Sequence, residues 1–219
     1  MYVIGPMASL PALTMWLHIG TGVIAVLAGI GALITAKGSR RHRLAGKTFV
    51  GGMGFVVGTT VLLLGFDPTQ FRMILTLVAI FSGYLAFSGY RVLSRKRSSD
   101  EAQPIDLTAA GVVIAACLLL GGWGLWQLGS GRSFGTVMVV FGGIGLAFGS
   151  ADVHRFLSAR RAGSWQVTHL QRMIAAFIAT VSAVSAVNLT ATLGIAAWLW
   201  PTAAFAPLIA FWSNKYDRT

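Results

Sequence analysis

The side chains best suited to chemistry in this chain are its histidines and the charged residues beside them. Two of the four histidines, His154 and His169, fall with Asp152 in the stretch SADVHRFLSARRAGSWQVTHLQRM, residues 150–173. A neutral imidazole can ligate zinc or a haem iron, and an imidazole beside a carboxylate can relay protons. Which chemistry applies depends on the elements that position these groups.

The composition places the chain among integral membrane proteins. Of its 219 residues 55% are hydrophobic and only 11% are charged, whereas a soluble domain of this length needs more charge to cover its surface. The net charge of +11 is explained by the excess of Lys and Arg that membrane proteins carry in cytoplasmic loops. We therefore expect the lipid bilayer, and no nucleic acid, as the partner of this chain.

Apolar segments of about the length that crosses ~30 Å of hydrocarbon recur along the chain. Seven of them cover about residues 13–36, 48–66, 71–93, 107–128, 134–154, 167–188 and 191–212. They predict an all-α, polytopic bundle of seven transmembrane helices that forms one domain over residues 1–219. Pro201 is expected to kink the last span or to end its first half.

The basic residues predict the orientation of this bundle. All but two of the 17 Lys and Arg residues lie in or beside the loops after the first, third, fifth and seventh segments. The exceptions are Arg72 and Arg132. Because Lys and Arg are enriched on the cytoplasmic side, we expect an outside amino terminus and a cytoplasmic carboxyl terminus in a bacterial inner membrane.

This topology sets the depth of each histidine. His42 falls in the first cytoplasmic loop, and His154 and His169 fall at the cytoplasmic ends of the fifth and sixth spans. His18 lies about 7 Å into the first span from the outer face. Asp152 and His154 are two positions apart, so they should point about 200° apart on a helix. Ionisable groups inside spans are costly and predict a partner or a function.

Haem is the first cofactor that these groups suit. Two imidazoles from different helices, or an imidazole and a thioether, can ligate a haem iron. The residues that predict such a site are His18, His42, His169 and Met173. Met173 also suits a purely packing role. We therefore expect a membrane redox protein that binds b-type haem at the cytoplasmic face.

A zinc site is an alternative, because three protein ligands and a water form the catalytic zinc pattern. Its ligands would be His42, His154 and His169, with Asp152 orienting one of them. This set predicts a zinc-dependent membrane hydrolase.

Binding of an anion is a further alternative. The arginines that would receive an anionic headgroup or substrate are Arg43, Arg155 and Arg172, and Arg172 is also expected to pair with Asp152. With His169 and Asp152 exchanging protons, this set predicts a proton-coupled carrier or a lipid-handling protein.

Other residues predict how the helices pack. Gly54-x-x-x-Gly58 and Gly145-x-x-x-Gly149 predict close helix packing within the chain, or a homodimer face. Tyr84, Tyr90 and Asn188 are expected to form hydrogen bonds between helices. A small Gly-rich bundle of this kind also suits an accessory subunit of a membrane complex.

Two stretches carry a resemblance to a known family. They are KGSRRHRLAGKTF, which follows His18 and a Gly-rich span, and THLQRMIAAFIATVSAVSAVN, followed by WLWPT and a closing NKY. They resemble an uncharacterised family of bacterial multi-pass membrane proteins catalogued as domain of unknown function 2306. The positions that match it are His18, His42, Arg43, Gly46, Asp152, His169 and Met173. The resemblance implies the fold and the location of the site, and no activity.

Overall fold

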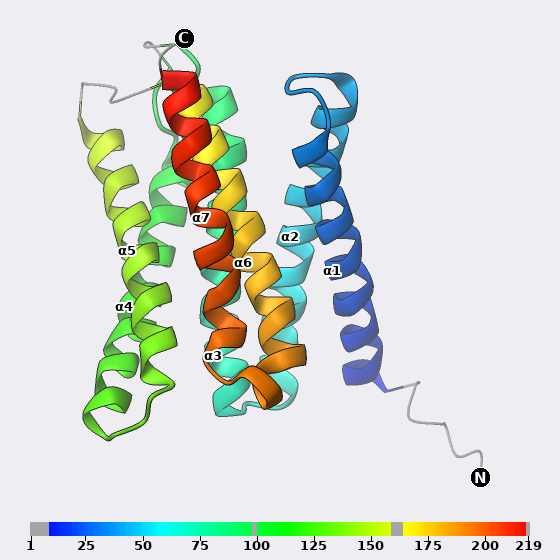
Figure 1. Cartoon of the computed structure of the whole chain (residues 1–219), viewed down its shortest axis with the longest axis vertical. Coiled ribbons are helices and arrows are strands. Elements are labelled where there is room, and N and C mark those ends of the chain that lie inside the picture. Colours follow the sequence, from blue (N-terminus) through cyan, green and yellow to red (C-terminus); the bar gives the residue numbers. More distant parts are fainter. Residues whose placement is uncertain (1–8, 98–99, 159–163, 218–219) are drawn as a thin grey trace. The chain divides into compact units, whose positions relative to one another are not determined.

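The computed structural model describes residues 9–97, 100–158 and 164–217, and its long elements are α-helices joined by short loops (Figure 1). These helices are α1 (Leu10–Ile34), α2 (Arg40–Phe66), α3 (Gln70–Arg91), α4 (Pro104–Gly129), α5 (Gly135–Leu157), α6 (Trp165–Leu193) and α7 (Ala196–Asp217). A short 3-10 helix, η2 (Val92–Ser94), follows α3. The all-α class is confirmed.

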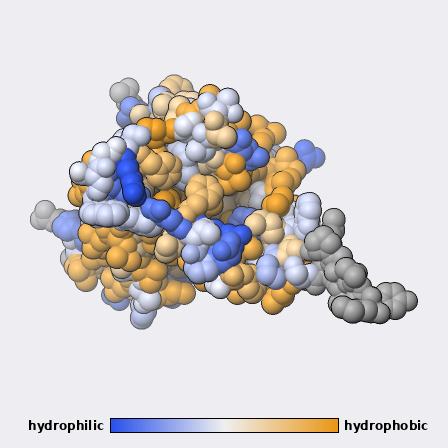
Figure 2. Space-filling model, turned by 90° about the horizontal axis from the view of Figure 1, so that it is seen from below, coloured by the Kyte–Doolittle hydropathy of each residue, from blue (hydrophilic) through white to orange (hydrophobic). Residues whose placement is uncertain are grey.

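Among the described residues, six helices, α1 to α6, are long and apolar enough to cross a membrane. Helix α7 does not belong to this set, because Pro201, Pro207 and its tryptophans lower its mean hydropathy. Figure 2 shows hydrophobic side chains over much of the visible face, with hydrophilic ones in smaller patches between them. A helical membrane protein is therefore supported, while the seventh span and the orientation stay predictions.

One expected boundary is wrong for a local reason, and one of the two effects expected of Pro201 is excluded. Residues 40–47 belong to α2 and not to a loop, because the Ser39 side chain accepts a hydrogen bond from the backbone N–H of His42 and caps the helix at Arg40. His42 therefore lies on a helix. Pro201 does not end the last helix, since α7 runs through it to Asp217.

The chain divides into two compact units, Met1–Ala79 and Ile80–Thr219, and the boundary falls inside α3. In the first unit α1 and α2 pack as an antiparallel hairpin. A Cβ added at Gly54 or Gly58 would meet no described atom within 4 Å. Close packing of this pair of glycines against α1 is therefore not seen within the first unit, and the homodimer face stays a prediction. One domain over residues 1–219 stays a prediction.

In the second unit α4 pairs with α5 and α6 pairs with α7. A Cβ added at Gly142 of α5 would lie 2.8 Å from the backbone nitrogen of Gly121 in α4, and one at Gly149 would lie 2.8 Å from Ile114. Gly145 faces the Cys117 side chain. The packing predicted for Gly145-x-x-x-Gly149 is confirmed, and it holds the carboxyl-terminal end of α5 against α4.

Candidate functional site

A buried polar cluster joins three helices of the second unit. The Tyr84 hydroxyl of α3 donates to Asp152 Oδ2 of α5 at 2.6 Å, and Arg172 Nη2 of α6 donates to Asp152 Oδ1 at 2.7 Å. Arg172 is only 2% exposed and Asp152 only 4%. The predicted pairing of Arg172 with Asp152 is confirmed, as is the interhelical hydrogen bond of Tyr84. Asn188, in contrast, donates to the Val184 carbonyl of its own helix.

The helical period explains which residues of α5 join this cluster. Asp152 is buried whereas His154, two positions later, is exposed, as their predicted angular separation requires. Phe148 lies one turn before Asp152, and its carbonyl accepts a hydrogen bond from Arg172 Nη2 at 3.2 Å. The Arg172 guanidinium also lies over the Phe148 ring, 4.2 Å from its centroid. One face of α5 therefore holds the Arg172 guanidinium at three points.

The Arg172 side chain still has an unused donor. Its Nη1 is buried and has no hydrogen-bond acceptor among the residues that the structure describes. A second cation stands nearby, because Arg155 Nη1 lies 3.8 Å from Asp152 Oδ1 and its side chain is 34% exposed. Two guanidinium groups thus face one carboxylate. The cluster has an excess of positive charge beside an unsatisfied N–H donor.

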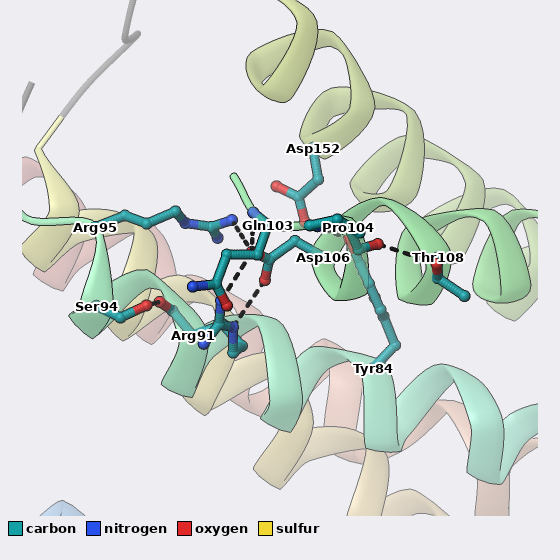
Figure 3. Close-up of polar contacts among 9 residues, drawn as sticks. All are labelled: Tyr84, Arg91, Ser94, Arg95, Gln103, Pro104, Asp106, Thr108 and Asp152. Carbon is teal, nitrogen blue, oxygen red and sulfur yellow. Dashed lines mark hydrogen bonds and ion pairs between the residues drawn. The ribbon is translucent and has the colours of Figure 1, made fainter. Parts of the chain in front are cut away.

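A second carboxylate lies at the same end of the second unit. Asp106, near the start of α4, is 2% exposed. Arg91 Nε and Nη2 donate to its two oxygens at 2.9 and 3.0 Å, and the backbone N–H of Gln103 donates to Oδ2 at 2.9 Å (Figure 3). Arg95 Nη1 lies 2.9 Å from the same Oδ2. Asp106 therefore ties the end of α3 to the start of α4.

Arg95 connects the two carboxylates. Besides Asp106, the Asp152 carboxylate acts on its guanidinium, and Figure 3 shows Arg95 together with both carboxylates and Tyr84. Burial lowers the pKa of Arg95, and the Asp106 carboxylate opposes that effect. An arginine stays protonated at neutral pH. Arg95 also lies over the Phe156 ring of α5, 4.6 Å from its centroid, so it is held beside the Asp152 cluster.

Sequence reasoning did not single out Arg91, Arg95 or Asp106 as site residues. The available signal was local: Gln103-Pro104-Ile105-Asp106 opens an apolar helix with an acidic residue three positions after the N-cap, which is the capping-box spacing. In a chain with only six acidic residues, a carboxylate at that position was a candidate for a buried ion pair.

In three of the predicted histidines, Nδ1 forms a hydrogen bond with a residue of a neighbouring helix. His42 Nδ1 lies 3.0 Å from the Ala32 carbonyl and His169 Nδ1 lies 2.7 Å from the Gly89 carbonyl. A carbonyl only accepts, so Nδ1 carries the hydrogen in both rings. His18 Nδ1 lies 2.9 Å from Thr59 Oγ1. Such anchoring of one ring nitrogen is typical of histidines that ligate a metal through the other.

The predicted zinc ligands do not form a set. Within residues 9–97, 100–158 and 164–217, no group of three or more His, Cys, Asp or Glu side chains could hold a metal ion. Asp152 is occupied by Arg172 and Tyr84, and His154 is exposed. The structure therefore gives no support to the site of His42, His154, His169 and Asp152.

The predicted haem ligands are also separated. His18 bonds to Thr59 of α2, and His42 lies on α2 itself and bonds to Ala32. Residues 42 and 59 are about 25 Å apart along the axis of α2, so the two histidines lie near opposite ends of that helix. These two histidines cannot share one haem. Met173 packs where α3 and α6 cross, and its sulfur would lie 3.0 Å from a Cβ added at Gly89. This position suits the packing role that the sequence also allowed.

The predicted anion-binding arginines divide between the units. Arg155 and Arg172 come together around Asp152 in the second unit. Arg43 belongs to the first unit, where it is exposed and its Nη1 donates to the Gly38 carbonyl. Two of the three arginines therefore contact the same carboxylate.

No protein-family model matches this chain, and neither a curated protein nor a solved structure matches it. The resemblance carried by residues 16–53 and 165–216 stays a prediction.

Proposed function

We propose that this protein is a multi-span membrane protein that binds an anionic group at Arg172, as a carrier or a lipid-handling protein does. The observation that carries this proposal is the buried Arg172 Nη1, which has no acceptor among the described residues. A buried donor without an acceptor costs about 1–3 kcal/mol, and more on a charged group. An anion in contact with Nη1 removes that cost.

The charge of the cluster favours an anion over a water molecule. Arg155 and Arg172 together carry two positive charges against the single Asp152 carboxylate. The guanidinium is also preorganised, because Asp152 and the Phe148 carbonyl fix its Nη2 while Tyr84 holds the other oxygen of Asp152. Hydrogen bonds between a guanidinium and an anion are among the stronger ones in proteins.

The depth of Arg172 suits a lipid headgroup or a substrate that enters from the membrane surface. Arg172 is seven residues after the start of α6 at Trp165, or about 10 Å along the helix axis. The proposal retains the seven-span topology, with this basic end of the second unit facing the cytoplasm of a bacterial inner membrane. Anionic lipids are a natural source of the bound group there.

The test is native mass spectrometry of the purified protein released from nanodiscs that contain phosphatidylglycerol. We expect retained anionic lipid on the wild type and on Arg132→Gln, a matched loss of one arginine at the opposite end of α4 and α5. We expect at least tenfold less on Arg172→Gln, since one charge-assisted hydrogen bond is worth about 1.5–3 kcal/mol. Equal retention by Arg172→Gln and the wild type would contradict the proposal.

A second candidate function is redox chemistry with b-type haem, and the anchored histidines favour it. The Nδ1 of His42 and of His169 is bonded to a carbonyl, and such anchoring is typical of histidines that ligate a metal. The test is the visible spectrum of protein from native membranes, oxidised and then reduced with dithionite. A Soret band that is lost in His169→Ala supports haem binding, and a featureless spectrum rejects it.

A further inference from the structure

We infer that the anionic group is a phosphate monoester or inorganic phosphate, held between the guanidinium groups of Arg172 and Arg95, and that Asp106 positions Arg95 for this contact. The inference rests on the proposed function, because Arg172 is the first arm of the site. It adds the second arm, the positioning residue and the class of anion.

Arg95 has the properties that a second arm needs. Its Nη1 is buried and makes no hydrogen bond with a described residue, although it forms an ion pair with Asp106 Oδ2 at 2.9 Å. In Figure 3 its guanidinium lies near Asp152, whose carboxylate acts on its charge, and Asp152 is the partner of Arg172. Among the described residues of the second unit, two buried guanidinium nitrogens thus make no hydrogen bond, Arg95 Nη1 and Arg172 Nη1. Arg172 bonds to Asp152 through Nη2, and Arg95 lies near the same aspartate (Figure 3).

The charges specify the anion. Arg91 neutralises Asp106 through two hydrogen bonds. The remaining ions are three arginines, Arg95, Arg155 and Arg172, against the one carboxylate of Asp152, so the site carries two uncompensated positive charges. A phosphate monoester carries about −1.5 to −2 at pH 7 and has three strong acceptor oxygens. A carboxylate or a phosphodiester, with one charge, leaves part of that excess uncompensated.

Asp106 acts on the site through Arg95. Two sets of contacts hold the Asp106 carboxylate in place: the bidentate contact with Arg91 and the hydrogen bond from the Gln103 backbone at the start of α4. Figure 3 shows Arg91 and Arg95 converging on it from α3 and the residues after it. The Phe156 ring supports the Arg95 guanidinium from α5. These contacts restrict Arg95 to the neighbourhood of Asp152, so less conformational entropy is lost when it binds.

The experiment is lipid titration followed by native mass spectrometry of the full-length protein. The probes are phosphatidic acid (a monoester), phosphatidylglycerol (a diester) and inorganic phosphate as competitor. The variants are Arg95→Gln, Arg172→Gln and Asp106→Asn, and the control is Arg132→Gln. We expect phosphatidic acid to bind the wild type at least tenfold more tightly than phosphatidylglycerol. Arg95→Gln should weaken the binding of phosphatidic acid about 10- to 100-fold and abolish that preference.

A positioning role for Asp106 predicts a different pattern. Asp106→Asn keeps all three arginines of the site, so it should weaken phosphatidic acid less than Arg95→Gln does. In the Arg95→Gln background, Asp106→Asn should have no further effect, because the residue it positions is gone. If Asp106→Asn further weakens the binding of phosphatidic acid in the Arg95→Gln background, the positioning role of Asp106 is overturned. Arg95→Lys, which keeps the charge without the fork, should retain part of the affinity and replaces Arg95→Gln if the latter does not fold.

The outcomes separate this inference from the proposed function. If Arg172→Gln loses anionic lipid while Arg95→Gln binds both lipids as the wild type does, the inference is overturned and the proposed function stands. If Arg172→Gln also binds as the wild type does, both fail. If the wild type binds phosphatidic acid and phosphatidylglycerol with equal affinity, the inference that the bound group is a phosphate monoester is overturned. If millimolar inorganic phosphate displaces phosphatidic acid, free phosphate is identified as the ligand. If phosphatidic acid stays bound in the presence of phosphate, the lipid headgroup is identified as the ligand.

Discussion

The carbonyl of Gly89 accepts a hydrogen bond from His169 Nδ1 at 2.7 Å, at a point where α3 and α6 make close contact. A Cβ added at Gly89 would lie 2.9 Å from Arg172 Cβ and 3.0 Å from Met173 Sδ. A single glycine thus allows the close approach that orients the His169 ring and brings Arg172 to Asp152. Packing and site geometry depend on the same residue here.

Substitution of Gly89 by alanine should therefore weaken both the fold and the site. The added methyl meets the Cβ of Arg172, and overpacking of this kind costs about 1–3 kcal/mol. We expect a lower midpoint in thermal unfolding of the detergent-solubilised protein, together with less bound anionic lipid. Gly111→Ala is the control, because a Cβ there meets no described atom within 4 Å and alanine favours helix. An equal effect of the two substitutions would contradict the close approach.

Removal of the Tyr84 hydroxyl should destabilise the protein without changing its shape. Tyr84→Phe deletes the 2.6 Å hydrogen bond to Asp152 Oδ2, and a hydrogen bond to a charged group contributes about 1.5–3 kcal/mol. The measurement is the free energy of unfolding in mixed micelles titrated with denaturing detergent. Tyr90→Phe, at a side chain that is 40% exposed, should leave that free energy unchanged. If Tyr84→Phe leaves the free energy of unfolding unchanged, the Tyr84 hydroxyl contributes nothing to the stability of the buried pair.

The two charges of the Asp152–Arg172 pair should be strongly coupled. Either Asp152→Asn or Arg172→Met leaves one buried group without its partner, which costs about 3–5 kcal/mol. The double variant removes both, so its loss in the free energy of unfolding should be smaller than the sum of the single losses by about 0.5–3 kcal/mol. Strict additivity in this double-mutant cycle would mean that the 2.7 Å contact is energetically unimportant.

The predicted topology can be checked with single cysteines and a membrane-impermeant maleimide on intact cells. Ser133→Cys, in the turn between α4 and α5, should react from outside. Arg97→Cys and Lys215→Cys should react only after lysis, and Cys117 is buried and should not react in either case. If Lys215→Cys reacts from outside, α7 does not cross the membrane. If Ser133→Cys and Arg97→Cys exchange their behaviour, the orientation is reversed.

Patterns along single helices were the part of this protein that could be predicted from the sequence. Apolar runs about 20 residues long indicate membrane helices whatever those helices pack against. The helical period alone separates buried Asp152 from exposed His154. The closely packed Gly145 and Gly149 were likewise visible as small residues one turn apart. Each of these features depends only on residues within a few turns of one another.

Apart from the predicted pair of Arg172 and Asp152, the contacts between helices were decided by the tertiary structure. Tyr84 and Asp152 are 68 residues apart, and Gly89 and His169 are 80 residues apart. No local rule indicates that α3 passes beside both α5 and α6. The same limit applies to Gly54 and Gly58, whose spacing resembles that of Gly145 and Gly149 although no described atom meets them.

The sequence by itself therefore determined what kind of helices this protein has, because hydropathy and helical period are local properties of the chain. Only the tertiary structure decided that Arg172, and not a histidine, stands at the centre of the buried cluster. A charged side chain in an apolar environment is stable only where other helices supply its partners, and those partners are Asp152, Tyr84 and the Phe148 carbonyl.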